Sequence, residues 1–347
     1  MHVLRKIVPP ILLVFGLCGS QLTKAQSADL GAPAAVIWRD PGKIAERDLH
    51  YGPGASHLAP AAPFIFVQEV KSGESPKFEV RDSRGVKWVV KLGEEAQAET
   101  VATRLVWSVG YFAEEAYYFK RVQIRRLPQL SRGMEYVGRS GNVLGARFEP
   151  RREHIQRGST WDWDKNAFED TRELNGLKVL MVLLNNYDAR KENNQVLLVK
   201  DPATGVVEAQ HTVTDLGATL GKAGGLGGKR SKNNLEDFLS TKFVRGVEKD
   251  GSVEFDYDTR PTKLGMLSAV YPPYYRGQVK KEKSMRKIPV EHARWIGSLL
   301  AQLTDDQLRT AFTVAGYDPS TTSSYVNTLR TRITQLTQLN SGAASLP

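Results

Sequence analysis

The stretch that most constrains the fold joins an apolar helix to a pair of carboxylates. Residues 173–185 (ELNGLKVLMVLLN) are apolar at most positions, which predicts a helix buried within a domain. Asp188 follows in a loop, Asn193 comes five residues later, and Asp215 begins an Asp-Leu-Gly sequence. The sequence therefore places three oxygen-bearing side chains shortly after a buried element.

Two short strands are predicted between the two aspartates. Residues 195–199 and 209–214 have the composition of strands, and the Asp-Pro-Ala-Thr-Gly sequence between them is typical of a turn. Because a hairpin returns the chain to the end from which it started, we expect Asp188 and Asp215 to lie at neighbouring ends of one hairpin. Gly217 is expected to permit a sharp backbone turn after Asp215.

These side chains are of the types that a phosphoryl-transfer site needs. Such a site requires a divalent metal held by hard oxygen ligands and a carboxylate that orients the nucleophile. Asp188 is the candidate catalytic group, and Asn193 and Asp215 are the candidate metal ligands. The competing interpretation is that Asp and Asn are ordinary turn residues, because the D-x-x-x-x-N spacing also arises by chance.

A lysine and a glutamate upstream supply further parts of such a site. Strands are predicted at 64–70, 77–82 and 87–93. Lys91 lies near the end of the third strand, and a helix with acids in its first turn follows and ends at Gly110. We expect Glu99 on this helix to pair with Lys91, with Glu95 as the alternative partner. The simpler interpretation is an exposed lysine at a strand end.

Further strands and helices are predicted between and after the segments described above. A strand is expected at 115–124, and residues 134–147 are expected to form a strand and the connection between two lobes. Phe148–Pro150 is the predicted hinge, where adenine could bind. The remaining helices are predicted at 289–303, 305–315 and 320–339, and Thr304 is a candidate N-cap.

Residues 222–232 (KAGGLGGKRSK) form a glycine-rich, basic segment just after Asp215. Two interpretations stay open for it. It is either a substrate loop whose lysines meet phosphate or an acidic substrate, or a mobile solvated loop. It is not a Walker A loop, because the preceding strand and the G-K-[ST] ending are missing.

The order of Lys91, Glu99, Asp188, Asn193 and Asp215 resembles that of the protein-kinase-like superfamily. The similarity is to its atypical branch, with HipA-like kinases, phosphatidylinositol kinases and secretory-pathway kinases. The resemblance implies an α+β fold of two lobes, with a strand-rich N-lobe at 64–150 and a mainly helical C-lobe at 151–339. It also implies ATP and Mg or Mn as cofactors, with a nucleotide-binding pair in which Lys91 meets the phosphates and Glu99 is the partner of Lys91.

Departures from the kinase pattern leave the activity open. The chain has no His-Arg-Asp, no Asp-Phe-Gly, no Ala-Pro-Glu and no G-x-G-x-x-G before Lys91. We expect a phosphotransferase with an unknown acceptor, which could be a protein, a sugar or a lipid. The alternatives are a non-catalytic pseudokinase-like binding protein, an enzyme that transfers AMP, and a basic polymer-binding protein in which the acids are only turn residues.

The N-terminal 27 residues have the pattern of a secretory signal peptide. A basic start precedes a short apolar run, and small residues follow at 25–28. Cleavage would remove Cys18, the only cysteine, and place the protein in the periplasm or outside the cell without a transmembrane anchor. Retention of the segment as a membrane anchor is the alternative. Residues 28–63 are expected to be a Pro/Gly-rich arm, and residues 340–347 a flexible tail.

The net charge of +10 indicates anionic partners without selecting one. Nucleic acid, anionic envelope polymers and phosphate-bearing ligands would all fit this charge. The kinase-like residues favour a nucleotide over nucleic acid. Because ATP is scarce outside the cytoplasm, an exported enzyme would need its own supply of nucleotide or a different donor.

Overall fold

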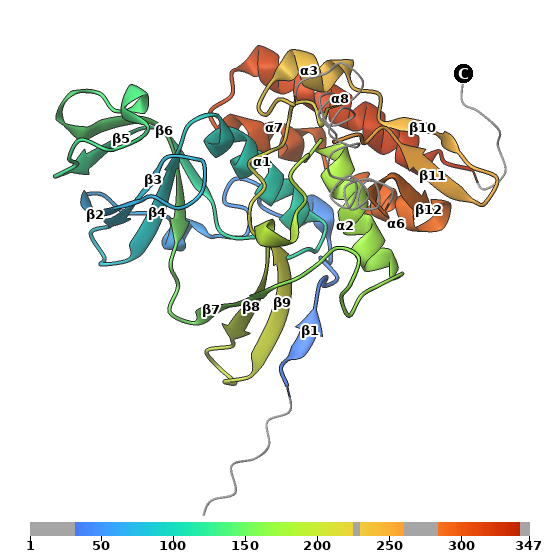
Figure 1. Cartoon of the computed structure of the whole chain (residues 1–347), viewed down its shortest axis with the longest axis horizontal. Coiled ribbons are helices and arrows are strands. Elements are labelled where there is room, and N and C mark those ends of the chain that lie inside the picture. Colours follow the sequence, from blue (N-terminus) through green and yellow to red (C-terminus); the bar gives the residue numbers. More distant parts are fainter. Residues whose placement is uncertain (1–31, 225–229, 260–283, 341–347) are drawn as a thin grey trace, which may run out of the picture. The chain divides into compact units, whose positions relative to one another are not determined.

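Five strands close into a barrel in the first half of the chain (Figure 1). The computed structural model describes residues 32–224, 230–259 and 284–340. In the order in which they pair, the barrel strands are β2 (Phe64–Val70), β3 (Lys77–Arg81), β4 (Lys87–Leu92), β6 (Asn142–Pro150) and β5 (Tyr117–Arg125). A short parallel pairing of β2 with β5 closes the barrel, and the other four pairings are antiparallel.

Aromatic and β-branched side chains fill the barrel. Phe78 and Val80 on β3 face inward with Trp88 and Val90 on β4, as the alternation of apolar residues predicts. The ring of Phe148 on β6 lies in the same core, with its centroid 6.3 Å from that of Trp88. The barrel therefore has an apolar core of its own.

A second sheet has the strand order β1-β9-β8-β7. Its strands are β1 (Ala34–Val36), β9 (Val207–Val213), β8 (Asn194–Lys200) and β7 (Ile155–Thr160). β8 and β9 form the predicted hairpin, in which Asn194 is opposite Val213. Asp201 closes the turn by accepting hydrogen bonds from the backbone of Ala203 and Thr204, at 2.8 Å each.

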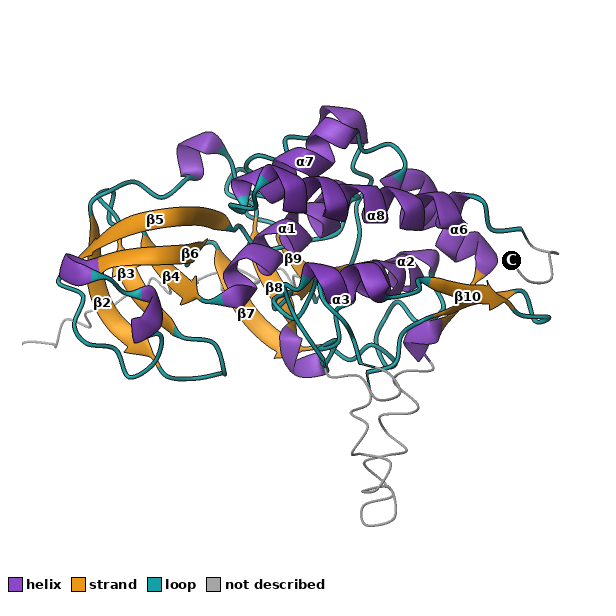
Figure 2. Cartoon of the chain, turned by 90° about the horizontal axis from the view of Figure 1, so that it is seen from above, coloured by secondary structure: helices purple, strands orange, loops and turns teal. Residues whose placement is uncertain are grey.

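Helices dominate the second half of the chain (Figure 2). The helices are α1 (Glu94–Ser108), α2 (Arg172–Leu183), α3 (Leu235–Ser240), α6 (Val290–Leu300), α7 (Asp305–Val314) and α8 (Pro319–Thr337). A third sheet consists of β10 (Val244–Val247), β11 (Ser252–Phe255) and β12 (Lys287–Pro289). Single-turn 3-10 helices lie at Ile44–Glu46, Ser56–Leu58, Met134–Tyr136, Arg139–Gly141 and Lys191–Asn193.

The apolar helix α2 forms the centre of the helical core. Every residue from Leu174 to Leu183 is buried, which is typical of a helix surrounded by other elements. Thr171 caps its start, because the Thr171 hydroxyl accepts a hydrogen bond from the Leu174 backbone at 3.2 Å. α2 packs against α6 and β12, so it is held by elements distant in sequence.

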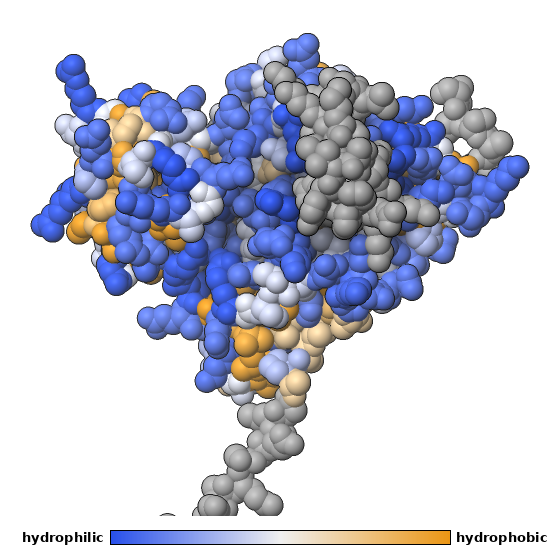
Figure 3. Space-filling view, in the orientation of Figure 1, coloured by the Kyte–Doolittle hydropathy of each residue, from blue (hydrophilic) through white to orange (hydrophobic). Residues whose placement is uncertain are grey.

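The surface is mainly hydrophilic on the face shown in Figure 3. Apolar side chains gather there over the barrel and over the hairpin of β8 and β9. The exposed large apolar residues of the described chain are Ile65, Val67, Met134, Leu144, Val206 and Leu239. Val206 precedes β9 at the tip of the hairpin.

Most of the expected elements are present, with ends that differ by a few residues. The predicted hinge is wrong, because Phe148, Glu149 and Pro150 belong to strand β6 and pair with Val90, Val89 and Trp88 of β4. Burial of the Phe148 ring in the barrel core explains why the strand continues this far. The chain leaves the barrel after Pro150 and enters β7 at Ile155.

Some of the predicted segments lie outside the described residues. These are the signal peptide at 1–27, residues 225–229 of the glycine-rich segment and nearly all of the tail at 340–347, which therefore stay predictions. The described residues from Ala34 onward form one compact unit. In the part of the chain that the structure describes, no helix has the length and apolar character needed to cross a membrane.

The arm that precedes β2 is tied to helix α1 by a buried arginine. Ile44 and Leu49 of the arm are buried in the same core as α2. Arg104 on α1 donates hydrogen bonds of 2.9 Å to the backbone oxygens of Leu49 and His50, and a third to Thr100. Burial lowers the pKa of Arg104 to about 10. The arm is therefore part of the folded unit.

We expect Arg104→Met to destabilise the protein by about 2–4 kcal/mol, because it leaves buried carbonyl oxygens without donors. The free energy of unfolding in urea measures this loss, and faster amide hydrogen exchange in residues 44–52 would place it in the arm. The matched control is Arg309→Met on α7, whose ion pairs with Asp305 and Asp306 are exposed. Equal unfolding midpoints for the two variants would contradict the prediction.

Candidate functional site

The five residues selected from the sequence lie in one chain of ion pairs and hydrogen bonds. Lys91 contacts Glu99 and Asp215, the backbone nitrogen of Asp215 faces the backbone oxygen of Asn193, and the Asn193 amide contacts Asp188. These contacts join strand β4, helix α1, the loop just before β8 and the segment just after β9. Residues far apart in the sequence thus converge on a single site.

Lys91 is surrounded by three carboxylates. Its Nζ lies 2.8 Å from Glu99 Oε2, 3.2 Å from Glu95 Oε2 and 3.3 Å from Asp215 Oδ1. Helix α1 begins two residues after β4 ends, and residues 95 and 99 are one turn apart on one helix face. Both the expected partner Glu99 and the alternative Glu95 therefore reach the lysine.

This arrangement keeps the lysine charged although it is buried. Burial by itself lowers the pKa of Lys91, but the charges of Glu99 and Asp215 outweigh that effect and raise it above its ordinary value. Burial also raises the pKa of Glu99, against the opposing effects of Arg147 and Lys91. The pKa of Glu95 is instead lowered to about 2, because Lys91, Lys232 and Ser75 stabilise its ionised form more than burial disfavours it.

Arg147 is a buried member of this cluster that the sequence analysis missed. It is opposite Lys91 in the pairing of β4 with β6, and its Nε lies 3.3 Å from Glu99 Oε2. Its Nη2 donates a 3.0 Å hydrogen bond to Glu149, two residues along the same strand. The signal was the alternation of Arg147 and Glu149 with apolar residues in a strand that is buried on both faces.

Asp215 connects the lysine to the hairpin. Its Oδ1 accepts a 3.1 Å hydrogen bond from the Gly217 backbone in addition to the contact with Lys91. The backbone oxygen of Asn193 accepts from the backbone nitrogens of Thr214, at 2.9 Å, and of Asp215, at 3.4 Å. The Asp215 side chain is 44% exposed, so this carboxylate meets solvent where Lys91 does not.

Asp188 is held by two neighbours in its own loop. The Asn193 Nδ2 donates to its backbone oxygen at 2.8 Å and to its Oδ2 at 2.9 Å. Arg190 pairs with both carboxylate oxygens, with Nε 2.5 Å from Oδ1 and Nη2 2.8 Å from Oδ2. The sequence predicted that Asn193 would turn toward a metal, whereas its amide nitrogen faces Asp188.

The loop that carries Asp188 is fixed to the segment after Asp215. Asn185 has φ 53°, in the left-handed region, and its side chain donates a 2.7 Å hydrogen bond to the Gly221 oxygen. The Tyr187 backbone donates to the Ala218 oxygen at 3.3 Å. Arg332 on α8 donates to the Leu183 oxygen at 2.6 Å, which secures the end of α2. The two aspartates are therefore positioned by the same set of contacts.

Glu95 joins the lysine to two further loops. Its Oε1 lies 2.6 Å from Lys232 Nζ, and Ser75 in the β2–β3 loop donates a short hydrogen bond to its Oε2. A Cβ on Gly217 would lie 2.8 Å from Oε2 and 2.9 Å from the Glu95 Cβ. Gly217 does not have a positive φ, so the glycine allows close approach and not the sharp turn that was expected. A cavity of about 140 Å³ is lined by Ser75, Glu95 and Lys232.

The oxygen atoms of Asp215 and Asn193 are of the kind that Mg²⁺ or Mn²⁺ prefers. In the described residues, no donor is bonded to Asp215 Oδ2 or to Asn193 Oδ1. Three His, Cys, Asp or Glu side chains do not gather as a metal site anywhere in the described ranges. Two protein oxygens are nevertheless enough where a nucleotide's phosphates complete the coordination, so the donor set fits a metal bound with nucleotide.

Comparisons with known proteins yield one similar structure to set beside this geometry. No protein-family model matches the chain, and no curated protein matches it. The crystal structure of a Helicobacter pylori proinflammatory kinase, CtkA, is similar with a TM-score of 0.35 and 12% identity, covering 81% of this chain and 100% of that one. A TM-score of this size does not establish a shared fold, so the site's side chains carry the functional argument.

We expect Glu95→Gln to remove a pH-dependent part of the stability. The pKa of Glu95 is about 2 in the folded protein and its ordinary value is 4.5, so its contribution is complete above pH 4.5 and is lost as the pH falls toward 2. The difference in free energy of unfolding between wild type and variant should therefore shrink over that range. Urea unfolding at a series of pH values measures it.

The control for this prediction is Glu236→Gln, at an exposed position on α3. It should show the same acid dependence as the wild type. A Glu95→Gln difference that is constant from pH 7 to pH 2 would contradict the stated role of Lys91 and Lys232.

Proposed function

We propose that the chain is an exported, two-lobed, kinase-like phosphotransferase that uses a metal–nucleotide donor of the ATP type on an acceptor still to be identified. The single observation that supports this most strongly is the convergence on Lys91. The Nζ of this lysine, on a barrel strand, lies 2.8 Å from the glutamate on the next helix and 3.3 Å from the aspartate after the hairpin. Lysine, glutamate and aspartate in these positions are the parts that bind nucleotide in kinases.

Each residue has a definite part in the proposed reaction. Lys91 binds the phosphates of the donor, Glu99 holds the lysine in place, and Arg147 in turn holds Glu99. Asp215 and Asn193 hold the divalent metal, which when bound neutralises charge on the transferred phosphoryl group. The barrel and the helical part of the chain correspond to the two lobes of this proposal.

Asp188 orients the acceptor and takes its proton. As the acceptor's oxygen forms a bond to the γ-phosphorus, the bond between that phosphorus and the leaving diphosphate oxygen breaks, and the hydroxyl proton passes to the Asp188 carboxylate. Arg190 and Asn193 fix the orientation of this carboxylate. For Asp188 to accept the proton, at least one of its oxygens has to leave the Arg190 guanidinium.

The contact between Arg190 and Asp188 favours one alternative, a pseudokinase-like binding protein without catalysis. Both oxygens of Asp188 are occupied by Arg190, with contacts of 2.5 Å and 2.8 Å, and Oδ2 also accepts from Asn193. A carboxylate held in this way cannot face a substrate hydroxyl without rearrangement. Such a protein would bind nucleotide at Lys91 and Asp215 and would not turn it over.

We expect the purified mature domain to bind ATP with Mg²⁺ or Mn²⁺ and not with chelator, in a calorimetric titration. Asp215→Asn should weaken the metal-dependent binding by about tenfold or more, because it removes a negatively charged ligand. Asp188→Asn should bind ATP as the wild type does but lower phosphate transfer by about 10²- to 10⁴-fold. The matched control is Asp306→Asn on the exposed side of α7.

The outcomes separate the candidate functions. Transfer of label from γ-labelled ATP supports phosphotransfer, whereas transfer of label only from α-labelled ATP indicates AMP transfer. Metal-dependent binding without any transfer supports the binding protein. The absence of heat with every nucleotide would contradict the proposal, and so would unchanged binding by Asp215→Asn.

A further inference from the structure

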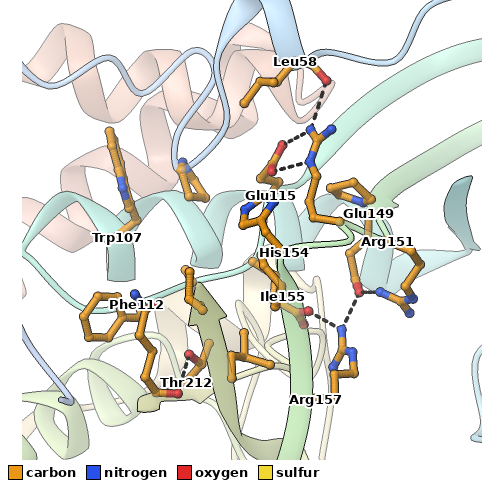
Figure 4. A pocket seen from close by; sticks show the side chains of 18 of the residues that line it. Leu58, Trp107, Phe112, Glu115, Glu149, Arg151, His154, Ile155, Arg157 and Thr212 are labelled. Carbon is orange, nitrogen blue, oxygen red and sulfur yellow. Dashed lines mark hydrogen bonds and ion pairs between the residues drawn. The ribbon is translucent and has the colours of Figure 1, made fainter. Parts of the chain in front are cut away.

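A large cavity lies away from the candidate site, on the other side of the barrel's last strand (Figure 4). Its volume is about 870 Å³, in the range of small-molecule pockets. The wall combines the N-terminal arm, the end of α1, the end of β6, and strands β7, β8 and β9. Lys91, Asp188 and Asp215 do not line it, so it is distinct from the site described above.

Four of the five arginines in the wall are balanced by glutamates. Arg39 pairs with Glu208, Arg151 with Glu149, Arg152 with Glu115, and Arg157 with Glu114. Figure 4 shows Arg151 and Arg157 meeting Glu149 at one end of the cavity. Each of these four guanidinium groups therefore already has a carboxylate partner.

Arg47 is the exception. In the described residues no carboxylate lies within ion-pair distance of its guanidinium, which donates one hydrogen bond there, of 3.1 Å to the Pro41 oxygen. Its Nε is buried and makes no hydrogen bond there. Burial lowers the pKa of Arg47, and no neighbouring anion opposes that effect. A half-buried cation without a counter-charge is costly, and a bound anion would remove that cost.

The surroundings of Arg47 are suited to a flat apolar group. The guanidinium stacks on Trp107, with its carbon 3.7 Å from the ring centroid. The cavity is also lined by Phe112, Ile155 and Leu197, which present apolar surface within the same space. Figure 4 places Trp107, Phe112 and Ile155 around the opening between α1 and the β8–β9 hairpin.

We propose that this cavity binds a small aromatic carboxylate, whose carboxylate pairs with Arg47 and whose ring lies against Trp107, Phe112 and Leu197. The guanidinium fork matches a carboxylate in geometry and can donate two parallel hydrogen bonds to it. Arg47 is the one wall arginine without a carboxylate within ion-pair distance in the described chain, so a ligand with one carboxylate group is the simplest match. This site goes beyond the proposed phosphotransfer and does not depend on it.

The test is calorimetric titration of the whole mature protein with 2-naphthoate and with its uncharged analogue 2-naphthamide. Wild type should bind the acid about tenfold or more tightly than the amide, as a charge-assisted pair predicts. Arg47→Met should bind the acid and the amide equally. Arg309→Met on α7, the matched control, should keep the wild-type preference because its arginine is exposed, pairs with Asp305 and Asp306, and does not line the cavity.

A second variant tests the place of binding without changing charge. Leu197→Trp should place a larger ring where the ligand's ring lies and weaken binding of both ligands, while its thermal unfolding midpoint shows that it is folded. Failure of wild type to bind 2-naphthoate at millimolar concentration would overturn the proposal. Equal affinity of wild type for acid and amide would also overturn it, as would retained preference in Arg47→Met. Tighter binding of 2-naphthyl phosphate than of 2-naphthoate would overturn the carboxylate class.

Discussion

The structure of the site depends on keeping one lysine charged inside the protein. A buried ammonium is stable only where carboxylates surround it, and Lys91 has three of them within 3.3 Å. Two structural constraints bring these carboxylates to the lysine. Glu95 and Glu99 require the turn spacing of α1 directly after β4, and Asp215 requires the hairpin of β8 and β9 to end beside the barrel. The fold around the site is the means by which those three groups meet.

Much of this arrangement was predictable because it is local. The pairing of Lys91 with Glu99 follows from a strand, a short connection and a helix, and the proximity of Asn193 to Asp215 follows from a hairpin. Apolar alternation predicted the barrel strands β3 and β4, and the uninterrupted apolar run predicted the buried helix α2. Period and turn chemistry act over a few residues, so the sequence displays them directly.

The features that were missed depend on contacts between distant segments. Arg147 reaches Glu99 only because β6 pairs with β4 in the barrel. The sequences of the two strands do not show that they pair with each other. The hinge was misplaced for the same reason, since Phe148 continues the strand to complete the barrel core. The contact of the Asn193 amide nitrogen with Asp188 was not expected either, because it depends on side-chain rotamers in one loop that spacing alone does not fix; the amide oxygen is left for the predicted metal.

The charged groups beyond Lys91 connect the candidate site with the rest of the barrel. Glu99 contacts Arg147, Arg147 contacts Glu149, and Glu149 contacts Arg151 and Arg157 at the wall of the large cavity. In a buried series of this kind, removing one member leaves its neighbour as an unpaired charge, which is far more costly than the net worth of the pair. A continuous series of ion pairs therefore joins Lys91 to the cavity wall. Strand β6 carries Arg147 and Glu149 and so contributes to both sites.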